Sequence, residues 1–411
     1  MDTIILKEFE ELHIKDSRDI SKKIISKDDA ISLQSIIMNN EPVFKWGHKK
    51  LIAQHWVGTI SLKNLNIEIL PKLHGYVSDS ELRNVLTKMI LISHQSPSVK
   101  DLPGMVTTQK NSLLEILIDT FLNSLDKYVK EGLQYSYRKI NKNIPGVKGK
   151  ILFNKQFSRN ILNPTFFWCR YSKFTDDNMI NQFLKLCLIE MSKATMDNNN
   201  KNRIRYYLPI FDDIKIMPKD IALSHEMVFN STNYRVEQSY TYGKLFLKNI
   251  FSTLSAGNTA ISMMLFDMNS LYELFIYRVA HIIYRTNVIY QLRGNYLLQR
   301  KTDLKKFIGL RPDITIKRKD GSKDIIDTKW KIPKSFSKES DAYQMNAYST
   351  SIDDVKRVFI LYPYTLNSKM IDDYTFLDRN GVKRDLLIRT VDLMKILDWN
   401  DFIKEFESIL S

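Results

Sequence analysis

Two short segments near the C-terminus, residues 310–316 and 324–330, have the apolar spacing of strands. The first alternates isoleucine with threonine, and the second is apolar apart from two aspartates, a threonine and a lysine. Asp320-Gly321 lies in the polar stretch between them. An Asp-Gly pair between two strand-like runs is a strong signal for a tight turn. The pattern therefore predicts a β-hairpin.

Apolar residues at helical spacing lie on both sides of this hairpin. Residues 267–279 predict a helix before it, residues 341–348 predict a helix after it, and residues 355–361 predict a further strand. Helix, hairpin, helix and strand follow one another in the order of a restriction-endonuclease-like core. We therefore expect a mixed α/β domain over residues 261–411.

The first 110 residues predict a strand-rich module. Short strands are expected over residues 51–57, 58–62 and 65–70, with a turn at Gly58, and a helix is expected over residues 82–92. A small barrel or curled sheet is the expected form. Such a module could bind nucleic acid or a protein partner, and the pattern does not choose between them.

Residues 111–260 predict a mainly helical middle region. An amphipathic helix is expected over residues 112–133, with its apolar stripe packed in a core. Aromatic and basic residues interleave over residues 135–155, on a predicted hairpin around Pro145-Gly146. This composition suits base stacking or insertion into an acidic partner, and it equally suits a solvated basic loop. The apolar segment 260–284 contains charged residues, so it predicts a buried helix pair and not a membrane span.

Composition narrows the class of protein. A chain of 411 residues suggests two or three domains, and 44% hydrophobic residues are enough to build their cores. The net charge of +15 favours a polyanionic partner, nucleic acid before membrane, although lysine-rich composition can also follow from an AT-rich genome.

Two cysteines and seven scattered histidines indicate neither a disulfide framework nor a zinc site. No signal-peptide pattern opens the chain, so a cytoplasmic protein is expected. Without a glycine-rich phosphate loop, the chain is expected to bind no nucleotide itself.

The hairpin carries the residues for phosphodiester hydrolysis. It would fold Asp313 back toward Asp327, and Lys329 shares a strand face with Asp327 because strand side chains alternate. Two carboxylates can hold Mg²⁺, which polarises a phosphoryl oxygen and lowers the pKa of a bound water. The lysine can orient that water or stabilise the transition state. The same pattern equally fits an exposed hairpin whose charges only keep it soluble.

The flanking helices offer further polar residues. Glu273 can complete the metal site from the preceding helix, or it can interact along its own helix with Tyr277. Gln344 and Tyr348 stand one turn apart on the following helix. They can contact the scissile strand, or they can be ordinary surface residues.

Together these stretches resemble the McrC family, the nuclease subunit of McrBC modification-dependent restriction systems. The resemblance is carried by Gly58-Thr59-Ile60, residues 67–72, 147–151 and 171–178, Asn181-Gln182, Asp267-Met268-Asn269 with Glu273, Arg311-Pro312-Asp313, residues 327–331, and Gln344 with Tyr348. The block around the hairpin is its more specific part.

The resemblance implies a C-terminal PD-(D/E)xK endonuclease domain that uses Mg²⁺, with Mn²⁺ as an alternative. The implied metal ligands are Asp313, Asp327 and Glu273, the implied catalytic residues also include Lys329 and Gln344, and the expected DNA contacts are Tyr348, Lys331 and Lys317. The chain would then be a DNA endonuclease subunit of a type IV restriction system.

The resemblance also implies a partner, an McrB-like hexameric AAA+ GTPase that reads modified DNA, for example in a methylated-cytosine context. The McrC-like subunit docks in the motor and stimulates GTP hydrolysis. The expected contacts, chosen on composition, are Arg138, Lys139, Lys148 and Lys150. Two other hypotheses remain: a non-catalytic adaptor that bridges an AAA+ NTPase to DNA, and a nuclease that acts without a partner.

Overall fold

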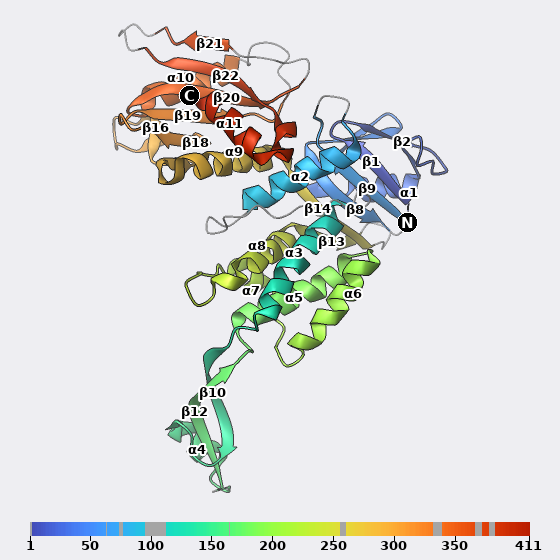
Figure 1. Cartoon of the computed structure of the whole chain (residues 1–411), viewed down its shortest axis with the longest axis vertical. Helices are drawn as coiled ribbons and strands as arrows, with labels where there is room; N and C mark the ends of the chain where they lie inside the picture. The colour runs from blue at the N-terminus through green and yellow to red at the C-terminus, as the bar shows by residue number, and fades with distance from the viewer. Residues whose placement is uncertain are drawn as a thin grey trace. The chain divides into compact units, whose positions relative to one another are not determined.

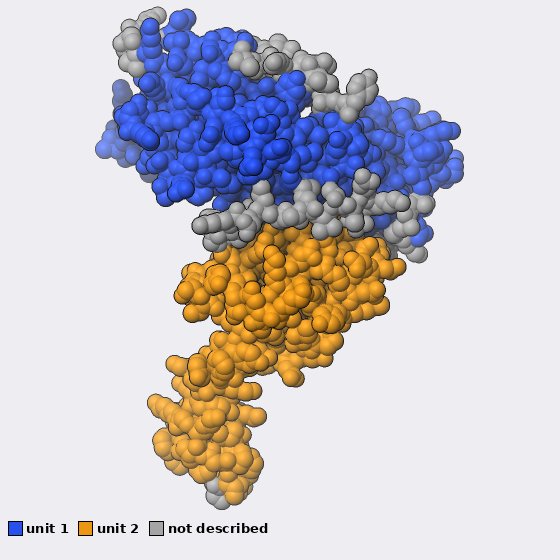
Figure 2. Space-filling model, viewed as in Figure 1, with its two compact units in different colours: residues 1–95, 101–114, 249–411 blue, residues 96–100, 115–248 orange. Residues whose placement is uncertain are grey.

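The computed structural model describes residues 2–62, 64–73, 77–94, 112–163, 165–254, 260–331, 339–365, 372–377 and 383–411. The chain mixes helices and strands throughout (Figure 1), as its sequence predicts. It forms two compact units (Figure 2): unit 1 comprises residues 1–95, 101–114 and 249–411, and unit 2 comprises residues 96–100 and 115–248. Among the described helices, none is long and apolar enough to cross a membrane.

Unit 1 begins with a five-stranded sheet. In spatial order its strands are β1 (Asp2–Lys7), β9 (Leu65–Leu70), β8 (Trp56–Leu62), β14 (Ala260–Asp267) and β13 (Ile250–Leu254). β1 and β9 are parallel, and the other neighbours are antiparallel. Buried residues from distant parts of the sequence share one core, including Leu6, Ile60, Ile67 and Leu265. The N-terminal sheet is therefore completed by strands some 190 residues later in the chain.

Two sequence predictions for this sheet are wrong. Gly58 is not in a turn: β8 runs through it with a φ of +136°, and a Cβ there would lie 2.0 Å from the Met264 carbonyl oxygen on β14. Close approach of β14 therefore requires glycine. Residues 260–267 form a strand and not the first of two helices, because a short apolar run also fits a strand with both faces covered. The helix α9 (Met268–Tyr284) begins only at its cap, Asp267.

A second, four-stranded sheet lies in the N-terminal part of unit 1. Its order is β3 (Ile24–Ile25), β2 (Glu11–Ile14), β7 (Lys50–Ala53) and β6 (Phe44–Gly47). Elements in the same part of the chain are α1 (Lys27–Gln34) and the pair β4 (Ile37–Met38) and β5 (Glu41–Pro42), whereas α2 (Asp79–His94) packs against β9 and α9. Ser26 and Asp29 form a capping box at the start of α1. The module is strand-rich, as predicted.

The C-terminal part of unit 1 is built on a six-stranded sheet. Its order is β15 (Val288–Tyr290), β18 (Ile314–Lys317), β19 (Lys323–Thr328), β20 (Val355–Pro363), β22 (Asp385–Val391) and β21 (Asp372–Thr375). β18 and β19 form the predicted antiparallel hairpin, and β19, β20 and β22 are parallel. The remaining elements are α10 (Glu339–Ser351), α11 (Trp399–Leu410), the hairpin β16 (Asn295–Gln299) and β17 (Lys306–Leu310), and the 3₁₀ helices η3 (Arg285–Asn287) and η4 (Leu393–Leu397).

Helices cover both faces of this sheet. Met345 and Tyr348 of α10 share a core with Ile360 of β20 and Ile388 of β22. On the other side α9 and α11 pack together, with the rings of Phe275 and Phe402 5.7 Å apart. The predicted helices and the predicted strand over residues 355–361 are confirmed. The ends of β18 and β19 are thus held in a layered α/β core.

Unit 2 consists of a group of helices and a small sheet. The helices are α3 (Leu113–Lys130), α5 (Met179–Ala194), α6 (Asn198–Tyr207), α7 (Lys219–Ser224), α8 (Glu237–Asn249), η1 (Leu208–Phe211) and η2 (Tyr234–Val236). The sheet has the order β10 (Ser136–Pro145), β12 (Phe166–Thr175) and β11 (Lys150–Ile151), with α4 (Phe153–Arg159) beside it. Within this unit the sheet extends away from the helices (Figure 1).

One prediction for unit 2 is wrong. The hairpin expected over residues 135–155 does not form, because β10 pairs along its length with β12, and β11 pairs with the other edge of β12. The polar stretch 196–202 contains the start of α6. Asp197 caps this helix, and the side chain of Asn200 donates at 2.8 Å to the buried carboxylate of Glu115. A buried carboxylate that needs donors explains why this polar run is ordered.

Glu8 joins the two parts of unit 1. It follows β1, is fully buried, and accepts hydrogen bonds from the Trp330 indole nitrogen at 3.0 and 3.1 Å and from the Lys72 backbone nitrogen at 3.0 Å. The Trp330 ring also lies 5.4 Å from the ring of Tyr272 on α9. Burial raises the pKa of Glu8 to about 7, although the bonds from Lys72 and Trp330 oppose the rise.

This carboxyl makes stability depend on pH. Its pKa in the folded chain lies above its ordinary value of 4.5, so folding takes up a proton between these values and stability falls as pH rises through them. At about 1.4 kcal/mol per unit, the decline amounts to roughly 3 kcal/mol. Glu8→Gln keeps an oxygen acceptor but cannot ionise, so we expect it to lack this decline. Urea unfolding between pH 5 and pH 8 measures the difference. The exposed Glu407→Gln is the control, and the same pH dependence in Glu8→Gln and the wild type would contradict the prediction.

Candidate active site

The hairpin brings Asp313 and Asp327 together at one end of the six-stranded sheet. Ile314 of β18 pairs with Ile326 of β19, and this register places the two aspartates opposite each other. Asp313 Oδ2 accepts hydrogen bonds from the backbone nitrogen and the hydroxyl of Thr328, at 2.7 and 2.8 Å. The predicted proximity of the two carboxylates is therefore present, and the strand after Asp327 fixes the orientation of Asp313.

Lys329 is the third member of this cluster. Its Nζ lies 2.8 Å from Asp327 Oδ2, and its backbone nitrogen donates to the Leu361 carbonyl at 3.0 Å. The backbone bond keeps the chain alongside β20 beyond the end of β19. Two carboxylates and one ammonium group are thus held on a rigid part of the sheet.

The pKa values in the cluster reflect its burial. Burial raises the pKa of Asp327 to about 7, repulsion from Asp313 adds to the rise, and Lys329 opposes it. Burial also raises the pKa of Asp313, against the two hydrogen bonds from Thr328. For Lys329, burial acts to lower the pKa, but attraction to Asp327 and Asp313 outweighs it and the pKa is raised. A further cation would therefore stabilise the ionised carboxylates.

Glu273 lies next to this pair on α9. Its Oε1 accepts a hydrogen bond from the side chain of Gln291 at 2.6 Å, and the backbone nitrogen of Gln291 donates to the Asp313 carbonyl at 2.8 Å. Burial, with repulsion from Asp313, raises the pKa of Glu273. Gln291 also accepts a hydrogen bond from Arg311. One glutamine thus connects the glutamate, the arginine and the backbone of the first aspartate.

Gln344 and Tyr348 reach the cluster from α10. Lys329 Nζ donates to Gln344 Oε1 at 3.4 Å, and the Gln344 amide donates to the Tyr348 hydroxyl at 2.7 Å. That hydroxyl donates to the Arg311 carbonyl at 3.2 Å. Burial raises the pKa of Tyr348 to about 12, so the hydroxyl keeps its proton at neutral pH. This chain of bonds orients Lys329 and holds the loop before Asp313.

The other expected contacts lie outside this cluster. Lys331 bonds to Asp341 near the start of α10. Lys317 is exposed at the opposite end of β18 from Asp313. The four expected partner contacts lie on or beside the small sheet of unit 2, and all are exposed: Arg138, Lys139, Lys148 and Lys150. The expected residues outside the cluster therefore lie in three separate places: beside Asp341, at the far end of β18, and on the small sheet of unit 2.

Sequence analysis gave no role to Gln291 and Thr328. Gln291 directly follows β15, the strand that pairs with β18, and Thr328 lies between the second aspartate and the lysine. Their only signal in the sequence is a polar residue at a strand end beside the motif. Their roles follow from contacts that appear only when the strands are paired.

The cluster suits a hard divalent cation through its two aspartates. In the described part of the chain, no group of three or more His, Cys, Asp or Glu side chains is placed to hold one metal ion. Mg²⁺ commonly takes only one or two protein carboxylates, with waters and substrate phosphates as its other ligands. Two opposed buried carboxylates fit that pattern, whereas the Glu273 oxygen that bonds Gln291 is already occupied by a donor.

Comparison with known proteins finds related structures. One match has a TM-score of 0.68 and 18% identity, and it covers 99% of each chain. It is a chain of the half-complex from the tetradecameric assembly of Thermococcus gammatolerans McrB AAA+ hexamers with bound McrC. A chain of the Thermococcus gammatolerans McrBC complex matches with a TM-score of 0.49 and 19% identity, over 67% of this chain and 86% of that one. The search of curated proteins finds no match. The first likeness extends over the whole fold.

A family comparison assigns the chain more directly. The sequence model described as McrBC 5-methylcytosine restriction system component matches residues 51–363. The match includes β8, β9, all of unit 2 and the cluster of Asp313, Asp327 and Lys329. The chain belongs to the family of McrBC 5-methylcytosine restriction system components.

Proposed function

We propose that this chain is the DNA-cleaving subunit of a type IV, modification-dependent restriction system, with a PD-(D/E)xK nuclease domain in residues 261–411. The observation that carries the proposal is the cluster of Asp313, Asp327 and Lys329 at the end of the β18–β19 hairpin. Family membership supports DNA as the substrate. The formal charge of +15 agrees with a polyanionic substrate.

Asp313 and Asp327 would hold Mg²⁺, with Glu273 beside them. When bound, this ion supplies Lewis-acid polarisation of the phosphoryl oxygen and a bound water of lowered pKa. Thr328 fixes the orientation of the Asp313 carboxylate through its two hydrogen bonds. Both carboxylates supply hard oxygen atoms, which are the ligands that Mg²⁺ prefers.

Lys329 is the group that would meet the substrate phosphate. Its ammonium stays protonated because Asp327 and Asp313 raise its pKa. It can therefore stabilise the charge that develops on the phosphorane oxygens as the attacking water adds. Gln344 accepts a hydrogen bond from Nζ and in turn bonds Tyr348, so the amine is oriented before substrate binds. Preorganisation of this kind lowers the cost of reaching the transition state.

A partner of the AAA+ class follows from the same family. The similar Thermococcus gammatolerans structure contains McrB AAA+ hexamers with bound McrC. We propose that this chain docks on a comparable GTP-hydrolysing hexamer through the small sheet of unit 2. Besides its basic residues, this region exposes Tyr135, Tyr137 and Phe174, and the Phe174 ring lies 5.2 Å from that of Tyr135 and 5.0 Å from that of Tyr137. An exposed aromatic group surrounded by cations is typical of a binding surface.

Substitution in the cluster tests the nuclease. We expect Asp313→Asn, Asp327→Asn and Lys329→Met each to reduce cleavage of modified DNA by a factor on the order of 100 or more, because each removes a charge that acts in the transition state. Cleavage is measured with the AAA+ partner, GTP and Mg²⁺, and EDTA should abolish it. Lys356→Met, an exposed position on β20 of the same sheet, is the matched control and should cleave normally.

The same variants separate the nuclease from an adaptor. All three should still assemble with the partner and stimulate its GTP hydrolysis, because the cluster lies in unit 1 and the docking sheet in unit 2. Wild-type cleavage by all three would remove the assigned site. If the wild-type complex also fails to cut DNA while GTP hydrolysis is stimulated, the non-catalytic adaptor becomes the better hypothesis.

Charge reversal in unit 2 tests the docking surface. We expect Lys139→Glu combined with Lys150→Glu to weaken assembly with the AAA+ partner about tenfold or more, and to reduce stimulated GTP turnover in parallel, because like charges would then face an acidic surface. Co-elution and GTPase assays measure the two effects. Lys127→Glu with Lys219→Glu makes the same change in charge on exposed helical positions of unit 2 and should behave as wild type. Equal loss in both pairs would contradict a specific role for the sheet.

A further inference from the structure

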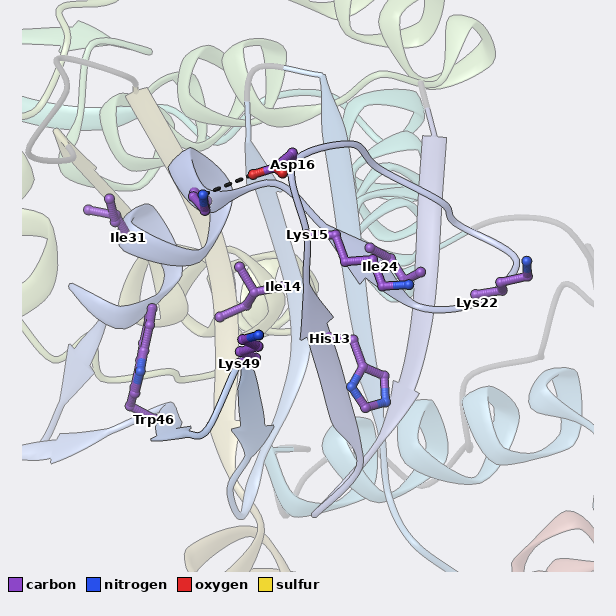
Figure 3. Close-up of a pocket in the computed structure, with 10 residues that line it drawn as sticks. His13, Ile14, Lys15, Asp16, Lys22, Ile24, Ile31, Trp46 and Lys49 are labelled. Atoms are coloured by element: carbon purple, nitrogen blue, oxygen red, sulfur yellow. Dashed lines mark ion pairs between the residues drawn. The ribbon is translucent and has the colours of Figure 1, made fainter.

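A second site for an anionic ligand lies in the N-terminal part of unit 1. A cavity of about 1130 Å³ opens between β2, β3, α1 and the turn after β6. Figure 3 shows its lining side chains, which come from the four-stranded sheet, the loops that connect its strands, and α1. The residues of the Asp313 cluster are not among them. The cavity is therefore not part of the candidate active site, and any ligand it binds would be bound separately.

The lining of this cavity is cationic. It contains Lys15, Lys22, Lys27 and Lys49 against one carboxylate, Asp16. Asp16 is bound by Lys27 at 2.9 Å (Figure 3), and Lys22 lies 3.7 Å from Asp19, a carboxylate outside the lining. Among the described residues, no carboxylate lies within ion-pair distance of Lys15 or Lys49. Concentrated, unpaired positive charge in a concave site attracts an anion.

One wall of the cavity is apolar and partly aromatic. The Trp46 side chain is 51% exposed and Ile31 is 50% exposed, and Ile14 also lines the cavity (Figure 3). Trp46 lies on the β6–β7 hairpin, and half its surface is left open to solvent instead of being packed in the core. A half-exposed indole beside aliphatic side chains is a stacking platform for a planar ring.

A phosphate backbone together with an accessible planar base matches both features. The volume exceeds the upper range of small-ligand pockets, about 1,000 Å³, so more than one nucleotide can enter. A duplex hides the faces of its bases, whereas a single strand exposes them. We propose that this cavity binds single-stranded DNA, with phosphates on Lys15 and Lys49 and one base stacked on Trp46. Only the choice of DNA over RNA rests on the proposed function.

The site would hold one strand at a distance from the cleavage cluster. Binding of this kind is tolerant of sequence, because every base has a face that can stack on an aromatic ring. Its affinity falls as salt rises, since each bound phosphate releases counterions. Binding of a strand of arbitrary sequence, measured at several salt concentrations, therefore tests the site.

The test uses the full chain with Asp327→Asn, so that cleavage does not interfere, and a fluorescein-labelled oligothymidylate followed by anisotropy. We expect Trp46→Ala to weaken binding by a factor on the order of 10, as for loss of one stacked base, and Trp46→Phe to restore much of the affinity. We expect Lys15→Gln with Lys49→Gln to reduce the slope of log affinity against log salt by about 0.7 for each lost phosphate contact. Thermal unfolding should be unchanged in the lysine pair, whose side chains are exposed, and Trp46→Phe separates loss of stacking from loss of the packed half of the indole.

Lys45→Gln is the matched control. Lys45 is exposed on β6 next to Trp46, but alternation along the strand turns it to the other face and it does not line the cavity. It should bind the strand as the wild type does. Four results would each overturn the proposal. Two concern variants: unchanged affinity in Trp46→Ala, or an effect of Lys45→Gln as large as that of the lysine pair. Two concern ligands: tighter binding of a blunt duplex, or tighter binding of an RNA strand. This test is independent of the nuclease test. If Asp313→Asn and Lys329→Met left cleavage intact, the assigned cleavage site would be wrong, but strand binding that depends on Trp46 would still support this cavity as a binding site.

Discussion

The structure of the candidate active site depends on holding two carboxylates opposite each other inside a sheet. Asp313 and Asp327 repel, and burial makes ionisation of both costly, as the raised pKa values show. Lys329 at 2.8 Å and the two donors of Thr328 supply the compensating interactions. Such an arrangement is a poor choice for stability alone, because apolar residues at these positions would be cheaper to bury. Under the proposed function, the arrangement would serve to bind a cation and a phosphate.

The surrounding contacts keep this costly arrangement in place. Glu8 accepts hydrogen bonds from Trp330, the residue after the lysine, and Trp330 packs against Tyr272, the residue before Glu273. One aromatic ring thus contacts the N-terminal module, the helix of the third acid and the strand that carries the cluster. Because β13 and β14 also complete the N-terminal sheet, the two parts of unit 1 share a core and backbone as well. The N-terminal module therefore supports the site mechanically, apart from any ligand it binds itself.

How much of this could be predicted depends on how local the determining interactions are. The hairpin follows from alternation and an Asp-Gly turn within 17 residues, and it alone predicts that Asp313, Asp327 and Lys329 meet. β14 was misassigned because an apolar run of eight residues fits either a helix or a strand until its partner β8, about 200 residues away, is known. The pairing of β10 with β12 likewise bypasses the turn signal at Pro145-Gly146. Gln291 enters the site only through contacts made after folding.

The lysines of unit 1 show why net charge alone does not locate binding sites. Lys329 is bound to Asp327, and Lys331 to Asp341, so each belongs to a compensated group inside or beside the sheet. In the N-terminal cavity, Lys15 and Lys49 have no such carboxylate among the described residues, and they lie with a half-exposed indole. A compensated lysine is oriented for chemistry on one atom, whereas uncompensated lysines around an open ring attract an extended polyanion. Under the two proposals, the same residue type would serve cleavage in one part of the unit and strand binding in the other, and the neighbouring carboxylates would decide which.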